Sequence, residues 1–337
     1  MAQAFCQKLP KVELHAHLNG SLSVSTIDKL HNLHKLAFPD ESVPSVTEIT
    51  IDPRSFDEGY AIFKFAQALV DHPAAVKLAT TNVLKEFADD NVVYLELRST
   101  PRNCESKMSK KDYIEAIVES IKSQKDITAT LLISIDRRKT VDEANENVNL
   151  AIELRTKYPD VIVGMDLSGD ARINDLQDYY PSLKRAKENG LKVSLHFAEE
   201  NNPTEIEFVL NCDAFKPDRV GHCTYVAQPK FLPQFCDKEI PSEICLTSNV
   251  KCGSVQSYEN HHLKEFHQRK LPFCICTDDK GVFSCSSSDE HYRAMQLLGL
   301  EPEEMLLHSL KCIDYIFAND TTKETLRAQI QSGIKTD

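Results

Sequence analysis

The sequence predicts a closed (β/α)8 TIM barrel with extra helices, and three observations lead to this fold class. Eight short runs rich in apolar and β-branched residues recur along the chain, and helical patterns with charged faces lie between them. Near-continuous apolar runs that alternate with helices are typical of a parallel sheet buried on both faces. Polar side chains end each run, as expected at the active-site face of a barrel. An open doubly wound sheet is the alternative fold class. It is less favoured because no Gly-x-Gly-x-x-Gly turn follows the first run.

The expected elements follow one another through the whole chain. The strands cover residues 12–18, 92–97, 128–135, 161–167, 191–197, 219–223, 242–246 and 271–276. Helical patterns cover residues 73–89, 109–125, 142–157, 175–189 and 258–269, and the segment from residue 302 onward is expected to close the outer ring. Residues 39–53 are expected to form a loop or insertion. Since such barrels take roughly 250 residues or more, we expect a single domain over residues 1–337.

Composition limits the classes of partner. The formal net charge of −12 argues against a nucleic-acid polymer, because polyphosphate binding depends on a basic surface. No run approaches the roughly 20 apolar residues of a membrane span, and the N-terminus lacks a secretory signal. The 11 cysteines are scattered, which suits reduced thiols better than a disulfide framework. We expect a cytoplasmic monomer that binds a small molecule and no membrane.

Four of the polar side chains at strand ends have the chemistry of a metal site. His15 and His17 alternate along one strand, so both imidazoles point to the same side. Neutral imidazole is a good zinc ligand, and catalytic zinc sites keep one position open for water. An isolated His-x-His is more often a hydrogen-bonded core pair, but His196 and Asp278 end two further strands. The four side chains together favour one zinc ion per chain.

Acid–base candidates lie beside this cluster. Glu199 follows His196 by three positions and can serve as a general acid/base if burial raises its pKa. His222 ends the sixth strand and can orient or polarise an attacking hydroxide. Asp278 and Asp279 are adjacent and point in different directions, one to metal and one to substrate. Each has an ordinary interpretation: a solvated acid, a structural histidine and a helix N-cap pair.

Other zinc chemistries lack their motifs. The cytidine-deaminase type needs His-x-Glu and Pro-Cys-x-x-Cys. In Cys274-Ile275-Cys276 only one residue separates the two cysteines, where that motif has two. A zincin needs His-Glu-x-x-His on a helix, which is absent. His261 and His262 are adjacent on an expected helix, so their rings should diverge and serve ordinary packing.

The motifs that carry these residues resemble the adenosine/AMP deaminase family. The matching segments are residues 11–21, 166–170, 196–199, 220–222 and 277–279, in the family's order and over nearly the whole chain. Segments 97–101, 246–251 and 278–283 and the His-Leu-Asn-Gly-Ser motif resemble the adenosine deaminase-like branch that acts on N6-methyl-AMP. Two departures are notable: Phe197-Ala198 replaces the usual Ala-Gly, and Asn19 replaces an aspartate that receives the ribose 5′-hydroxyl.

The resemblance implies a role for each matching residue. Glu199 would protonate purine N1 while hydroxide oriented by His222 attacks C6. The zinc ligands would be His15, His17, His196 and Asp278; Asp279 would bind N7 and the Gly169 amide would donate to N3.

The implied reaction converts N6-methyl-AMP to IMP and methylamine. Asn19 suits a 5′-phosphate because it avoids like-charge repulsion, and Arg98, Lys251 and Lys280 are the cations expected near that phosphate. The alternatives are an adenosine deaminase, an adenine deaminase, and a zinc- or purine-binding protein without turnover.

Overall fold

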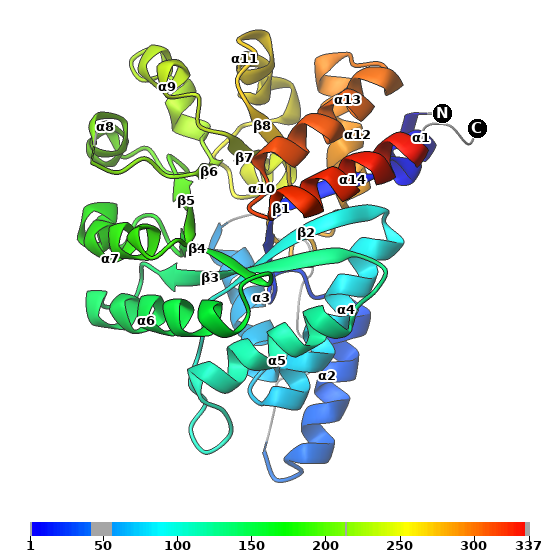
Figure 1. The fold of residues 1–337 in the computed structure, drawn as a ribbon, viewed down its shortest axis with the longest axis vertical. Coiled ribbons are helices and arrows are strands. Elements are labelled where there is room, and N and C mark those ends of the chain that lie inside the picture. Colours follow the sequence, from blue (N-terminus) through cyan, green and yellow to red (C-terminus); the bar gives the residue numbers. More distant parts are fainter. Residues whose placement is uncertain (1, 42–55, 213, 334–337) are drawn as a thin grey trace.

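The computed structural model describes residues 2–41, 56–212 and 214–333, with the strands at the centre of a ring of helices (Figure 1). Eight parallel strands pair in chain order, from β1 to β8. The ring closes beyond β8, where Asp278 N donates to His15 O at 2.8 Å and His17 N donates to Asp278 O at 3.0 Å. The predicted (β/α)8 barrel is confirmed.

Each expected strand is present. The strands are β1 (Lys11–His17), β2 (Val92–Ser99), β3 (Thr128–Asp136), β4 (Ile162–Ser168), β5 (Lys192–Phe197), β6 (Arg219–His222), β7 (Ser242–Ile244) and β8 (Phe273–Ile275). The last two are shorter than predicted. β7 ends early because Leu246 already begins a helix. Almost every strand residue is buried, as the continuous apolar pattern requires.

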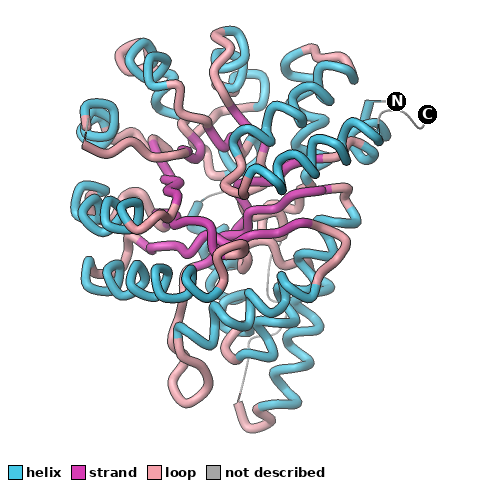
Figure 2. Tube along the Cα trace, in the orientation of Figure 1, coloured by secondary structure: helices cyan, strands magenta, loops and turns pink. Residues whose placement is uncertain are grey.

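The helices form the outer layer, which Figure 2 separates from the central strands by colour. The expected helices over 73–89, 109–125, 142–157 and 175–189 are present within two residues. Serine and threonine caps define several of their starts, as Ser109 does by accepting a hydrogen bond from Asp112 N. The helices are α1 (Ala2–Lys8), α2 (Val24–Ala37), α3 (Phe56–Leu69), α4 (Pro73–Asp89), α5 (Lys110–Ser123), α6 (Val141–Lys157), α7 (Leu176–Glu188), α8 (Pro203–Asn211), α9 (Leu232–Lys238), α10 (Leu246–Lys251), α11 (Leu263–Gln268), α12 (Ser287–Leu298), α13 (Pro302–Cys312) and α14 (Asp320–Gly333).

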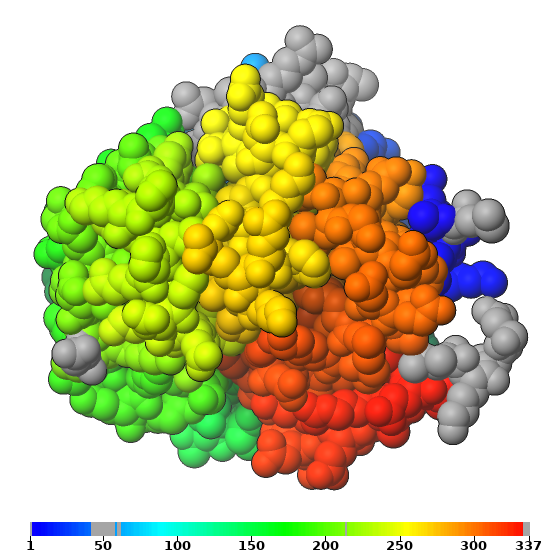
Figure 3. Space-filling view, turned by 90° about the horizontal axis from the view of Figure 1, so that it is seen from above, coloured from blue at the N-terminus to red at the C-terminus, as the bar shows by residue number. Residues whose placement is uncertain are grey.

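The helices of the second half of the chain, yellow to red, cover one side of the molecule as a continuous surface (Figure 3). The expected C-terminal helices α13 and α14 are part of it. Within the described ranges, no helix combines the length and the apolar character needed to cross a membrane. The loop expected over residues 39–53 lies almost entirely outside the described residues. That the whole chain forms one domain stays a prediction.

Candidate active site

Three imidazoles and one carboxylate meet at the carboxyl ends of the strands. His15 Nε2 lies 3.2 Å from His196 Nε2, and His17 Nε2 lies 3.1 Å from the same atom. Asp278 Oδ1 lies 3.4 Å from the Nε2 atoms of His15 and His17. Two ligands of a tetrahedral zinc ion, each at about 2.0–2.1 Å, are about 3.3–3.4 Å apart. The four atoms therefore have the spacing that one zinc ion requires.

Hydrogen bonds behind the cluster fix which ring nitrogens face each other. His15 Nδ1 donates to Glu243 at 2.7 Å, and His196 Nδ1 donates to Asp166 at 3.1 Å. In the neutral imidazoles both Nε2 atoms are then acceptors that face one another. Carboxylates that accept from the second imidazole nitrogen are the usual support of metal-binding histidines. This donor set fits a cation.

A buried network of ion pairs holds those carboxylates. Arg98 donates to Asp166 at 2.9 Å and to Glu243 at 2.7 Å, and Arg219 donates to Glu243 at 2.6 Å. Although burial alone would raise it, the charges of Arg98 and His196 hold the pKa of Asp166 below its ordinary value. Glu243 was not predicted as a site residue, although an acidic residue inside an apolar strand such as β7 is a signal that could have identified it.

Glu199 and His222 lie on the open side of the cluster. Glu199 Oε1 is 3.8 Å from His222 Nε2, which is 4.0 Å from Asp278 Oδ2. Burial raises the pKa of Glu199 to about 7 and lowers the pKa of His222 to about 4. A protonated carboxyl group and a neutral imidazole are thus both present near neutral pH, which suits proton transfer at this point.

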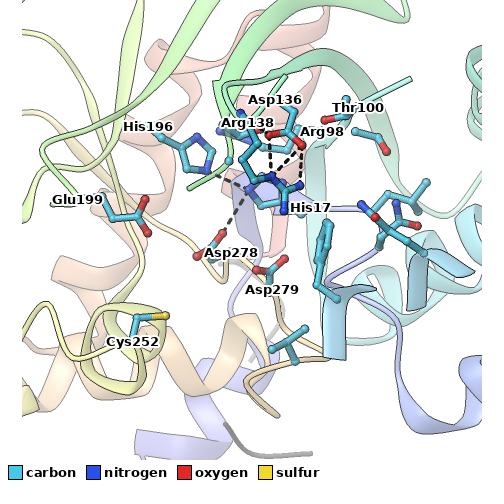
Figure 4. Close-up of a pocket in the computed structure, with 18 of the residues that line it drawn as sticks. His17, Arg98, Thr100, Asp136, Arg138, His196, Glu199, Cys252, Asp278 and Asp279 are labelled. Atoms are coloured by element: carbon cyan, nitrogen blue, oxygen red, sulfur yellow. Dashed lines mark hydrogen bonds and ion pairs between the residues drawn. The ribbon is translucent and has the colours of Figure 1, made fainter. Parts of the chain in front are cut away.

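A single cavity joins these groups to the other expected substrate ligands. Figure 4 shows His196, Glu199, Asp278 and Asp279 turned into it, with Cys252 on the wall. Asn19, Ser99 and Gly169 also line it, while Val282 and Phe283 give it an apolar side. Among the described residues, the buried Oδ1 atoms of Asn19 and Asp279 have no hydrogen-bond partner. Burial and the charge of Asp278 raise the pKa of Asp279 well above its ordinary value.

The three cations expected near a phosphate have protein partners of their own. Arg98 is fully buried in the ion-pair network, although it reaches the cavity wall. Lys280 pairs with Glu86 at 2.6 Å, and Lys251 donates to Phe283 O at 2.7 Å. Neither lysine is among the described residues that line the cavity. Arg98 and Lys280 pair with carboxylates in this acidic protein, and that these two residues and Lys251 bind a phosphate stays a prediction.

The backbone turns sharply where the strands end. Ala198 has φ +50°, His222 has φ +62° and Asp278 has φ +62°, all in the left-handed region that non-glycine residues rarely adopt. Strained residues of this kind cluster at functional sites. The alanine that replaces the family's usual glycine therefore adopts a conformation that glycine would favour, and Phe197 before it is buried.

His261 and His262 differ from the expectation. Their rings are stacked with centroids 4.3 Å apart and do not diverge, and both side chains are buried. The expected helix over 258–269 is broken into a 3-10 turn (Tyr258–Asn260) and α11, and the two histidines lie in the turn between them. His262 Nε2 donates to His222 O at 2.8 Å, which places the pair directly behind the site.

Known proteins match nearly the whole chain. The family model described as adenosine deaminase covers residues 10–333. An N6-methyl-AMP deaminase of Bos taurus is 42% identical over 336 residues, which cover 96% of this chain and 94% of the relative.

Solved structures agree in fold and sequence. The apo structure of the N6-methyl-AMP deaminase from Arabidopsis thaliana has a TM-score of 0.89 and 37% identity, with 98% of each chain covered. Structures of arabidopsis ADAL complexed with GMP and with IMP also give TM-scores of 0.89 at 37% identity. The GMP complex covers 98% of each chain and the IMP complex 97%.

Proposed function

The chain belongs to the adenosine deaminase family and is a hydrolase that deaminates purines; on this premise we propose that its substrate is N6-methyl-AMP. Water adds to C6, the C6–N6 bond breaks, and the products are IMP and methylamine. The observation that carries the proposal is the group of facing imidazole nitrogens and the Asp278 carboxylate beside Glu199. The names of full-length relatives at 37–42% identity support the N6-methylated nucleotide as substrate.

One zinc ion per chain would be held by His15, His17, His196 and Asp278. When bound, zinc supplies Lewis acidity that lowers the pKa of a water toward neutrality. Ser248 Oγ donates to Asp278 Oδ2 at 2.7 Å and so orients that carboxylate. Elemental analysis of purified protein tests this proposal: we expect one zinc per active chain and little or none in His196→Ala. Active protein without stoichiometric metal would contradict it.

The remaining side chains supply the proton and orient the base. Glu199, protonated near neutral pH, would give its proton to purine N1 and so draw electron density away from C6. His222 Nε2 would orient the attacking water, because it lies between Glu199 and Asp278. Asp279, kept protonated by burial and by the charge of Asp278, would donate to N7, and the Gly169 amide to N3.

Asn19 supports a nucleotide over a nucleoside. Its neutral amide lines the cavity, where an aspartate would place a negative charge close to a 5′-phosphate. Complexes of a full-length structural neighbour with GMP and with IMP support the same class of ligand. Adenosine deamination is the second candidate, and the loss of the aspartate that receives a 5′-hydroxyl counts against it.

A substrate panel tests the assignment. Adenine, adenosine, AMP, N6-methyladenosine and N6-methyl-AMP should be compared by ammonia or methylamine release from zinc-loaded protein. We expect the highest kcat/KM for N6-methyl-AMP. Preference for adenosine or adenine would replace the proposal by the corresponding deaminase, and no turnover of any member would leave a zinc- or purine-binding protein.

We also propose that the protein works in the cytoplasm as a monomer. All 11 cysteines are free, and seven of them are buried, which suits a reducing compartment. Sedimentation velocity of the zinc-loaded protein is expected to give a single species near 38.1 kDa.

A further inference from the structure

A line of hydrogen bonds runs from the backbone to His222, behind the wall of the cavity. Leu263 N donates to His261 Nδ1 at 3.1 Å. His261 Nε2 lies 3.2 Å from Asn249 Oδ1, and Asn249 Nδ2 lies 3.2 Å from His222 Nδ1. His261, Asn249 and His222 are at most 1% exposed, so water does not compete for these contacts.

The hydrogen bond from Leu263 N determines which atom donates in each of the other hydrogen bonds. A backbone N–H can only donate, so His261 Nδ1 must be the acceptor, and a neutral His261 carries its proton on Nε2. That proton goes to Asn249 Oδ1, which leaves the Asn249 amide nitrogen facing His222. If the amide were reversed, its nitrogen would oppose the His261 N–H, donor against donor. Asn249 therefore donates to His222 Nδ1.

These hydrogen bonds allow only one tautomer of a neutral His222. Because Nδ1 accepts, the proton of the neutral imidazole lies on Nε2, which is buried and has no partner among the described residues. Nε2 points toward Glu199 Oε1 at 3.8 Å and Asp278 Oδ2 at 4.0 Å. His262 holds the same residue from behind through its bond to His222 O, where φ is +62°.

We propose that His261 and Asn249 are positioning residues that fix His222 in the tautomer with its proton on Nε2, making Nε2 a donor toward the attacking water. The inference rests on the proposed hydrolysis, because the donor is useful only if a water is oriented there. His222 Nε2 then cannot remove a proton from that water. Its role is to donate a hydrogen bond to the oxygen and so to fix the direction from which that oxygen approaches C6.

Two substitutions interrupt this line of hydrogen bonds, and a third substitution restores it. Asn249→Leu removes the donor to Nδ1, and we expect kcat for N6-methyl-AMP to fall about tenfold or more, as for lost support of other active-site histidines, with KM within about twofold. His261→Phe should lower kcat in the same direction, because the amide can then reverse. His261→Gln keeps an N–H donor and should recover most of the loss. Ser254→Ala removes a different bond to Asn249, that to its carbonyl oxygen, and should leave kcat within about twofold.

Nitrogen NMR of histidine-labelled wild-type protein reads the tautomer without turnover. We expect the proton on Nε2 of His222, assigned by comparison with His222→Gln, and a mixture of tautomers in Asn249→Leu. A wild-type proton on Nδ1, unchanged kcat in Asn249→Leu with retained metal and thermal stability, or equal losses in His261→Phe and His261→Gln would overturn the inference. If wild-type protein turned over no purine at all, the proposed function would fail, and the spectrum would still decide the tautomer.

Discussion

Gly221 lies against the imidazole ring of His15, so closely that a Cβ atom at Gly221 would stand 2.6 Å from Cε1 and 2.9 Å from Nδ1. Strand β6 therefore needs a glycine where it passes the metal cluster. The ring cannot move away, because Glu243 holds Nδ1 at 2.7 Å. Packing between neighbouring strands thus decides where the His15 imidazole points.

Gly221→Ala is expected to displace His15 and weaken the metal site. We expect zinc content to fall at least severalfold after dialysis against a mild chelator, with activity lost in proportion. Gly299→Ala is the matched control: its φ is +66° and no atom lies within 4 Å of the new Cβ, so it should lose some stability and keep its metal. Full zinc retention in Gly221→Ala would show that β6 can move aside.

Glu199→Gln is expected to separate catalysis from metal binding. Glutamine keeps the size of the side chain but has no acidic proton to transfer. We expect kcat to fall about a hundredfold or more, as for other general acids, with zinc content unchanged. Near-normal turnover would assign the proton transfer to another group, with Asp279 the first candidate.

The raised pKa of Glu199 predicts how kcat/KM changes with pH on the alkaline side of the profile. Burial raises the pKa of Glu199 to about 7, so its carboxyl group stays protonated below that pH and loses its proton above it. As an acid it works only when protonated, so kcat/KM should decline as pH rises through about 7. The decline should disappear from the residual activity of Glu199→Gln. An increase in kcat/KM across this range would identify Glu199 as a base.

Asn19→Asp is expected to discriminate nucleotide from nucleoside. Asn19 Nδ2 donates to Tyr113 OH at 3.2 Å, and its free Oδ1 lies at the cavity. At about 4 Å and an effective dielectric constant near 20, each pair of unit charges costs on the order of 4 kcal/mol. We expect a far larger fall in kcat/KM for N6-methyl-AMP than for N6-methyladenosine.

Asn19→Ala is the control for that experiment, because it removes the amide without adding charge and should show weaker selectivity. Equal losses for both substrates in Asn19→Asp would refute placement of the phosphate near residue 19.

Ala198→Gly is expected to stabilise the protein. An L-residue in the left-handed region costs roughly 1–2 kcal/mol, while glycine costs about 0.5–1 kcal/mol through the greater entropy of the unfolded chain. With φ +50° at Ala198, the free energy of unfolding should rise by about 0.5–1 kcal/mol in urea denaturation. Ala328→Gly, exposed in α14, should instead lose about 1 kcal/mol. A loss at both positions would show that Ala198 packing outweighs its strain.

The barrel and the cluster of histidines and Asp278 at its strand ends were predictable because both follow local rules. Buried parallel strands are continuously apolar, and polar residues such as His196 and Asp278 stand out where these runs end. The supporting residues were not predictable, because His15 and Glu243 meet across 228 positions and a single sequence does not give barrel register. His261 was missed for another reason. The helical periodicity of residues 258–269 gave no sign of the turn that places His261 next to Asn249. The ion pairs of the cations near strand ends were not predictable either, because acidic partners such as Glu86 for Lys280 lie far away in sequence.

The buried His291 predicts how stability depends on acid. Its side chain is 2% exposed, Nδ1 donates to Ser287 O at 2.8 Å, and burial with the charge of Lys11 lowers its pKa to about 3. In the unfolded chain a histidine binds a proton near pH 6.5, so between about pH 6.5 and 3 the unfolded state holds one more proton at this residue. The contribution of His291 to the free energy of unfolding is therefore fully present above pH 6.5. It decreases as pH falls from about 6.5 to 3, by up to about 1.4 kcal/mol per pH unit.

His291→Gln removes this proton while keeping an N–H donor for Ser287. Urea denaturation of zinc-loaded protein at pH 7, 6 and 5 should show a smaller acid loss in the variant than in wild type, and contributions from the other histidines cancel in the comparison. His267→Gln, exposed in both folded and unfolded states, should follow wild type. Parallel curves for wild type and His291→Gln would mean that the folded protein takes up the proton at His291 as readily as the unfolded chain.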